Sequence, residues 1–307
     1  MFPRRAWALF LLAHQASAWN ATGHRIASAI AYDRLSEKAR YRVDALLAAH
    51  PDYASWSRDA PSDPRRRARA VFLAASVWPD EIRSDSRFYD DTRLNARPTP
   101  LLNGFPSMAR HVNWHYIDVP ISVGGAPSQP PRAPNALIES RRILKEINKI
   151  SEIQIKAYDL PWLIHLEEDL HQPLHCVTRF LKSQPNGDAG GNNVYVTPGR
   201  NLHALWDGAA GSDSSDAYVN RMAAEMSAAF IQENGLRPRL SKDPRKWVNE
   251  GVQLAIHDVY SFGFEAGLRD RPIALTEQYQ ATARRLARAR IALAGFRLAA
   301  VLNDKFR

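Results

Sequence analysis

The sequence is nearly devoid of cysteine, with only Cys176 among 307 residues. A single cysteine forms no disulfide within its own chain, which excludes a disulfide-braced scaffold, and we interpret it as a packed residue. Long apolar runs are also absent. The eight apolar residues at 6–13 are too few for the ~30 Å hydrocarbon core of a bilayer. At 45% hydrophobic and 24% charged, the composition is that of a folded globular chain, which excludes wholesale disorder.

Histidine, by contrast, is plentiful, with ten residues in the chain. If the protein binds metal, its ligands should therefore be imidazole and carboxylate groups rather than thiolates. The chain also carries 41 basic and 32 acidic residues, a net charge of +9. This balance agrees with an anionic partner but does not identify one.

The N-terminal eighteen residues have the features of a secretory signal peptide. An arginine pair and the apolar residues 6–13 precede the small residues Ala16 and Ala18, at positions −3 and −1 of a cleavage site. Cleavage before Trp19 would leave residues 19–307 with a net charge of +7, because two arginines and no acids are removed. We expect an exported bacterial protein, periplasmic or secreted, with no stable membrane association and no obligate protein partner.

Apolar residues recur at helical spacing over most of the chain, which predicts an all-α fold in one mostly helical domain. Only residues 193–196 have the pattern of a strand, so we expect at most a small hairpin. Eight prolines between 95 and 134 predict a long loop. The expected helices cover residues 36–49, 60–77, 135–158, 161–172, 212–231, 244–263 and 276–303. Arginines 284, 285, 288 and 290 are interpreted as a solvated helix face rather than a nucleic-acid patch.

Histidine and aspartate occur twice in pairs four residues apart, as His165 with Asp169 and His203 with Asp207. Residues at this spacing share a helix face, so both side chains of a pair can reach one ion. His175 lies between the pairs, after a proline that turns the chain. One such pair alone would be better explained as a surface ion pair. Two pairs together with His175 favour a metal centre.

Zinc suits this donor set because it binds neutral imidazole and carboxylate, and catalytic zinc sites keep one position for water. Asp80, His115 and His24 are further candidate ligands upstream. His24 lies five residues after Trp19, the predicted mature N-terminus. A free α-amine has a pKa of ~7.7–8.0 and can bind metal when neutral. Cleavage would therefore create one more ligand at Trp19.

The residues around these candidates resemble the S1/P1 nuclease family of zinc-dependent, single-strand-specific nucleases and 3′-nucleotidases. The resemblance extends from Trp19 to near the C-terminus, and weaker matches surround Glu250 and Arg297. The motifs that carry it are Trp19 with Gly23-His24, Trp78-x-Asp80, His115-Tyr116-x-Asp118, His165-x3-Asp169-x-His171-Gln172-Pro173-Leu174-His175, Gly187-Asp188-x-Gly190-Gly191-Asn192 and Asn201-Leu202-His203-x2-Trp206-Asp207.

The resemblance implies a mostly helical fold around three zinc ions. Asp169 would bridge two of them, and His171 would not be a ligand. The implied ligand sets are Asp80, His115, His165 and Asp169 for one ion, His175, His203 and Asp207 for a second, and the Trp19 amine and carbonyl, His24 and Asp169 for a third.

The resemblance further implies hydrolysis of single-stranded DNA and RNA to 5′-phosphorylated products, and hydrolysis of 3′-nucleotides. Asp80 and Asp169 would be the catalytic residues, with Asp80 orienting the attacking water. Tyr116 and Asp118 would stack on and hydrogen-bond a base, and stacking of this kind tolerates any base. Asn192 would donate to the substrate.

Two other functions compete with this interpretation. A zinc-dependent phospholipase C shares the three-zinc fold and the N-terminal Trp ligand. The short spacing from Trp19 to His24 and the motif that contains His203 and Asp207 favour the nuclease. A non-catalytic periplasmic zinc-binding protein would usually carry a His-rich tract, and the sequence has none.

Overall fold

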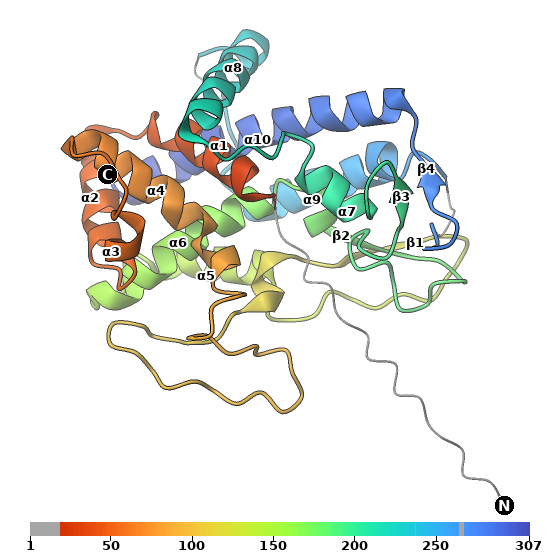
Figure 1. Ribbon diagram of the computed structural model, residues 1–307, viewed down its shortest axis with the longest axis horizontal. Coiled ribbons are helices and arrows are strands. Elements are labelled where there is room, and N and C mark those ends of the chain that lie inside the picture. The colour runs from red at the N-terminus through yellow and green to blue at the C-terminus, as the bar shows by residue number, and fades with distance from the viewer. Residues whose placement is uncertain (1–18, 237, 264–266) are drawn as a thin grey trace, which may run out of the picture.

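The computed structural model describes residues 19–236, 238–263 and 267–307. The predicted signal peptide, residues 1–18, lies outside the described residues. The described chain folds into a single, mostly helical domain, which confirms the all-α prediction (Figure 1). None of its described helices combines the length and apolarity needed to cross a bilayer. The helices are α1 (Ala21–Tyr32), α2 (Glu37–Ala48), α3 (Tyr53–Trp56), α4 (Pro64–Glu81), α5 (Ala136–Glu146), α6 (Ile153–Asp169), α7 (Leu202–Asp207), α8 (Asp216–Asn234), α9 (Pro244–Leu254) and α10 (Glu277–Lys305).

Helix α6 occupies the middle of the fold, and it carries the first His–Asp pair at its C-terminal end. All side chains from 157 to 169 are buried. The helix contacts α1, α2, α4, α5 and α10. A helix that is buried on every side delivers the polar groups of its last turn into the interior, where they need partners other than water.

Two predicted helix boundaries around α6 were wrong. The predicted helix 135–158 is in fact two helices, because α5 ends at Glu146 and α6 begins at Ile153. Pro161 lies inside α6 rather than at its start. An internal proline costs a helix about 3 kcal/mol. Complete burial of neighbours such as Leu160 and Trp162 offsets that cost, at roughly 1.5–3 kcal/mol for each large apolar side chain.

Other boundaries differ less. Helix α4 begins four residues later than predicted, because Asp63 caps it, and it runs through Pro79. Helix α9 is continued by a π-helical turn, Ala255–Val259. Helix α1 was not predicted at all. Its Asn20 side chain accepts a hydrogen bond from the Gly23 N–H and so caps the helix.

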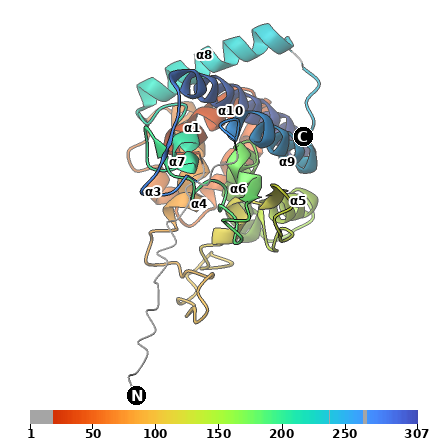
Figure 2. The same cartoon turned by 90° about the vertical axis from the view of Figure 1, so that its right-hand side faces the viewer.

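Helices α1 and α10 pack together closely beneath α8 (Figure 2). Helix α10 has 29 residues. A Cβ on Gly295 would lie only 2.6 Å from the Ala27 carbonyl oxygen, so this contact requires glycine. The prediction that the arginines of α10 form one solvated face was wrong for one of them. Arg284, Arg285 and Arg288 are exposed, but Arg290 is buried.

The few strands form two small parallel pairs rather than a hairpin. Strand β1 (Val119–Ser122) pairs with β2 (Val177–Phe180), and β3 (Val196–Thr197) pairs with β4 (Ile273–Ala274). The strand predicted at 193–196 therefore overlaps β3 at one residue. Parallel partners come from distant segments, because a tight turn cannot join them.

The Pro-rich segment 95–134 is mostly loop, as predicted, and part of it extends well away from the helices (Figure 1). It also contains strand β1 and the short 3-10 helix η1 (Val112–His115). A second 3-10 turn, η2 (Pro173–His175), follows α6. These two turns carry one predicted metal ligand each.

Candidate metal centre

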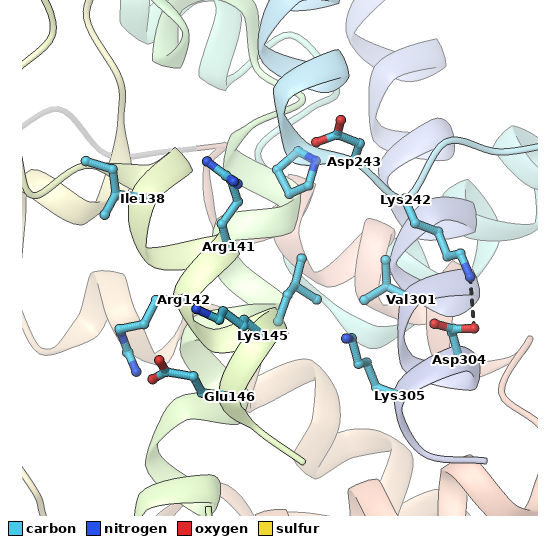
Figure 3. Close-up of a pocket in the computed structure, with 12 residues that line it drawn as sticks. Ile138, Arg141, Arg142, Lys145, Glu146, Lys242, Asp243, Val301, Asp304 and Lys305 are labelled. Carbon is cyan, nitrogen blue, oxygen red and sulfur yellow. Dashed lines mark ion pairs between the residues drawn. The ribbon is translucent and has the colours of Figure 1, made fainter. Parts of the chain in front are cut away.

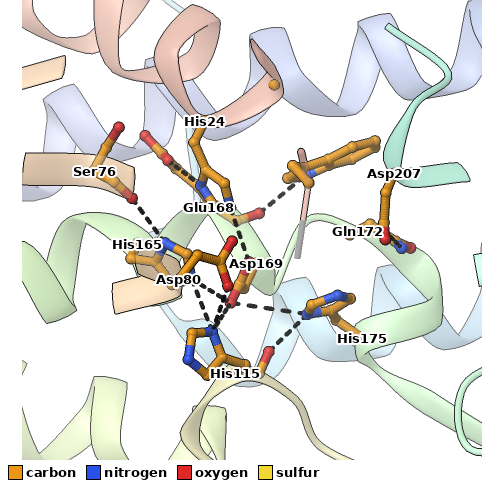
Figure 4. A network of polar contacts seen from close by, with 12 residues as sticks. His24, Ser76, Asp80, His115, His165, Glu168, Asp169, Gln172, His175 and Asp207 are labelled. Carbon is orange, nitrogen blue, oxygen red and sulfur yellow. Dashed lines mark hydrogen bonds and ion pairs between the residues drawn. The ribbon is translucent and has the colours of Figure 1, made fainter. Parts of the chain in front are cut away.

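Eight predicted ligands come from six separate elements and converge beside the end of α6 (Figure 4). They form three groups, and within each group the ligand atoms all lie within 4.8 Å of one another. Two groups share His165. The groups are His24, His165 and Asp169; Asp80, His115 and His165; and His175, His203 and Asp207.

Asp169 lies where these groups meet. Its Oδ2 atom is 3.1 Å from His165 Nε2 and 3.5 Å from His115 Nδ1. Its Oδ1 atom is 3.4 Å from His24 Nε2 (Figure 4). Both oxygens are buried without a hydrogen-bond partner among the described residues. Burial raises the pKa of this carboxyl to about 7. A buried, unpartnered carboxylate is costly, and bound cations would remove that cost.

The imidazoles of His175 and His203 are oriented by backbone carbonyls. His175 Nδ1 donates to the His115 carbonyl, and His203 Nδ1 donates to the Gly190 carbonyl, both at 2.7 Å. A carbonyl only accepts, so each neutral ring presents an Nε2 lone pair. These two Nε2 atoms are 3.1 Å apart. Two acceptors that face each other at this distance fit a cation bound by both.

His165 and His24 are oriented in the same way. His165 Nδ1 donates to the Ser76 carbonyl at 2.8 Å, and His24 Nδ1 lies 2.6 Å from Glu168 Oε2. Partners of this kind select the tautomer whose other nitrogen can bind metal. Burial, with His165 and His175 nearby, lowers the pKa of His24 well below its ordinary value. The neutral ring is the form that binds metal.

Several supporting polar groups were missed from the sequence. Besides its contact with His24, Glu168 accepts from the Ser28 hydroxyl at 2.6 Å. Gln172 Nε2 donates to Asp207 Oδ1 at 2.7 Å. Burial raises the pKa values of Glu168 and Asp207, whereas these donors favour the charged forms. The sequence did contain one signal for Glu168, because it is an acidic residue directly before Asp169 on a mostly apolar helix.

Arg83 is a charged residue beside the metal centre that was also not predicted from the sequence. Its Nη1 atom lies 3.3 Å from Asp80 Oδ1, and the side chain is 5% exposed. Asp80 is in the last turn of α4, and Arg83 lies two residues past the end of the helix, where its N–H donates to the Asp80 carbonyl. The guanidinium therefore adds a fixed positive charge beside the most accessible carboxylate of the centre. Asp80 is 14% exposed, whereas Asp169 is fully buried.

The first described residues run along the same centre. Trp19 is buried, and its indole Nε1 donates to the Glu168 carbonyl at 3.2 Å. The Asn20 N–H donates to the Asp207 carbonyl at 3.3 Å. The described part of the chain thus begins beside α6 and α7. Ligation by the Trp19 amine and carbonyl stays a prediction.

The three predicted substrate-binding residues are placed around the centre but not within the ligand groups. The Tyr116 hydroxyl donates to Asn113 Oδ1 at 2.9 Å. Burial and the nearby Asp188 carboxylate raise the pKa of Asp118 to about 6. Asn192 Nδ2 donates to the Ala189 carbonyl at 2.9 Å, next to the loop that orients His203. Their contact with substrate stays a prediction.

His171, which the resemblance left out of the ligands, belongs to a buried network. Its Nδ1 donates to the Glu167 carbonyl at 2.6 Å, and its Nε2 accepts from Arg297 Nη1 at 3.1 Å. Arg290 Nε donates to the His171 carbonyl at 3.0 Å. Glu250 accepts from both arginines. This network ties the turn between α6 and η2 to helices α9 and α10.

Comparison with known proteins gives one result for almost the whole chain. The family model described as S1/P1 Nuclease matches residues 19–307. A search of curated proteins returns no match.

Proposed function

The chain belongs to the metal-dependent S1/P1 nuclease family, and from this premise we propose that it is a zinc-dependent phosphodiesterase. It would hydrolyse single-stranded DNA and RNA to 5′-phosphorylated products and also act on 3′-nucleotides. The observation that carries the proposal is Asp169, whose unpartnered Oδ1 faces His24 while its unpartnered Oδ2 faces His165 and His115. Such a carboxylate is suited to bridge two cations.

We propose three zinc ions, in sets that overlap the observed groups. Asp169 would belong to two of the sets, and Trp19 would complete one of them only after cleavage. The sets are Asp80, His115, His165 and Asp169; His175, His203 and Asp207; and Trp19, His24 and Asp169. The neutral state that burial imposes on His24 and His115 supports imidazole ligation.

When bound, zinc ions would lower the pKa of a water molecule and offset phosphate charge. The protein's own groups would position the reactants. The partly exposed Asp80 carboxylate would orient the attacking water, and Arg83 would hold Asp80 in place. Because Asp80 is more accessible than Asp169, substrate would approach from the Asp80 side.

Preference for single strands would come from groups beside His115. Tyr116 would stack on a base and Asp118 would hydrogen-bond it, while Asn192 would donate to the substrate. A paired base is not free to enter such a pocket. Stacking would make the enzyme tolerant of sequence.

We further propose that residues 1–18 are a signal peptide and that the mature, exported protein is the nuclease domain 19–307. The contacts of Trp19 and Asn20 with α6 and α7 support this proposal, because cleavage before Trp19 would create a free amine beside the metal centre.

The deciding experiment uses the processed protein, beginning at Trp19. Its zinc content would be measured together with release of acid-soluble nucleotides from single-stranded DNA and RNA, with chelator and after zinc is restored. We expect chelator-sensitive cleavage that zinc rescues. Release of phosphocholine from lipid without nucleotide release would instead identify a phospholipase C. Tight zinc binding without either activity would identify a non-catalytic zinc protein.

A further inference from the structure

A hollow lies outside the metal centre, between α5, the start of α9 and the C-terminal end of α10 (Figure 3). Its volume is about 690 Å³, within the range of ligand-binding sites. None of its lining residues belongs to the metal ligands or the predicted substrate residues. We call this hollow the basic groove. Its basic residues are Arg141, Arg142, Lys145, Lys242 and Lys305, and its acids are Glu146, Asp243 and Asp304.

The acids of the basic groove do not neutralise all of its cations. Asp304 pairs with Lys242 at 2.9 Å. In the described part of the chain, no acid lies within ion-pair distance of Arg141, Lys145 or Lys305. Lys145 on α5 and Lys305 on α10 both line the groove (Figure 3). Uncompensated cations that line one hollow repel one another, and a bound anion reduces that repulsion.

The shape of the groove favours a chain of anions over a single one. Arg141 and Lys145 are one turn apart on α5, about 6 Å along the helix axis. Lys242 and Lys305 form the opposite side. The lining also includes the apolar side chains of Ile138, Leu144, Pro244 and Val301. Phosphates alternating with sugars and bases present the same combination of charge and apolar surface.

We propose that the basic groove is an auxiliary nucleic-acid-binding site that holds backbone phosphates of a single-stranded substrate outside the metal centre. This inference rests on the proposed nuclease function. The groove contacts phosphates, which carry no sequence information, so it raises affinity for long strands of any sequence. Substrates too short to reach beyond the metal centre gain nothing from it.

The test measures binding of a labelled oligo(dT) of several tens of nucleotides by fluorescence anisotropy, in an Asp169→Asn background that prevents cleavage. Lys145→Ala/Lys305→Ala is compared with the matched control Lys149→Ala/Lys246→Ala. The control lysines are exposed and do not line the groove. Each phosphate contact contributes about 0.7 to the slope of log affinity against log salt for single strands.

We expect the groove variant to lose about 1.4 from this slope, so its deficit should grow by about 25-fold between 1 M and 0.1 M salt. The control should keep the background slope, and binding of a labelled dinucleotide should be unchanged in both variants. Equal slopes in groove variant and control would overturn the proposal. Loss of dinucleotide binding in the groove variant would also overturn it. Binding to phosphatidylglycerol vesicles is measured alongside, and a groove variant that lost vesicle binding but kept oligo(dT) binding would overturn the proposal too. Wild-type cleavage is assayed in parallel, so a chain that binds through the groove but cleaves nothing contradicts only the nuclease proposal.

Discussion

The Nε2 atoms of His175 and His203 face each other at 3.1 Å, although one residue lies in η2 and the other in α7. Each ring is held in this pose by a carbonyl that accepts from its Nδ1. The protein thus directs two lone pairs at one point before any ligand is considered. That arrangement has a cost unless a cation is bound there, which ties the stability of the fold to metal binding.

Metal removal should therefore destabilise the protein as well as inactivate it. We expect the melting temperature to fall on addition of chelator and to recover when zinc is restored, because a ligand that binds only the folded state stabilises it. Differential scanning calorimetry of the processed protein checks this. An unchanged melting temperature, with zinc shown to be absent, would contradict the metal assignment.

Asp169→Asn should abolish activity and reduce zinc content. The substitution keeps the shape of the side chain but removes the charge that faces both His24 and His165. We expect a loss of more than about 100-fold in kcat/KM, beyond the 10–100-fold typical of residues that only support ligands. Asp213→Asn, at an exposed position, is the control. Full activity in Asp169→Asn would refute its role.

Glu168→Gln should weaken metal binding without removing a ligand. Glu168 contacts His24 Nδ1 and accepts from Ser28. Replacing the carboxylate leaves His24 less well oriented and less basic, so zinc affinity should fall by roughly 10–100-fold. Competition with a fluorescent chelator measures this. Ser28→Ala removes only one neutral donor and should have a smaller effect; the reverse order would count against Glu168.

Glu250→Gln should destabilise the fold through the arginine network. Glu250 accepts from Arg290 and Arg297, both of which are largely buried. Loss of its charge leaves both guanidinium groups poorly compensated, so we expect a loss of about 1–3 kcal/mol in the free energy of unfolding. Glu225→Gln, in the exposed pair with Arg221, should cost about 0–1 kcal/mol. Urea unfolding of the two variants compares them, and equal losses would contradict the prediction.

Asp118→Asn should change how stability depends on pH. Folding raises the pKa of this carboxyl to about 6, against ~3.9 in an unfolded chain. The folded state therefore holds the proton more tightly, and the stability this provides is lost as pH rises from about 4 to about 6. The variant does not titrate there, so its stability relative to wild type should increase over this range by up to about 3 kcal/mol. Parallel pH profiles would contradict this prediction.

The class of the fold and the local pairing of ligands could both be predicted from short stretches of sequence. Helical periodicity is a property of short windows, so α2 and α10 were predicted within about two residues of their ends. The spacing of His165 and Asp169 already places both on one helix face. The family, too, was recognisable from motifs, and the family match confirms it.

Which of the polar groups meet could be seen only once the helices and strands were packed together. The parallel strand pairs, the burial of Arg290 and the contact between Glu168 and His24 join segments far apart in the chain. Pro161 was misjudged because packing around α6 outweighs a local rule. The basic groove likewise exists only because the fold brings α5, the start of α9 and the C-terminal end of α10 around one hollow. Local pattern reflects the backbone's short-range preferences, whereas the metal centre and the groove depend on long-range packing that no window of sequence contains.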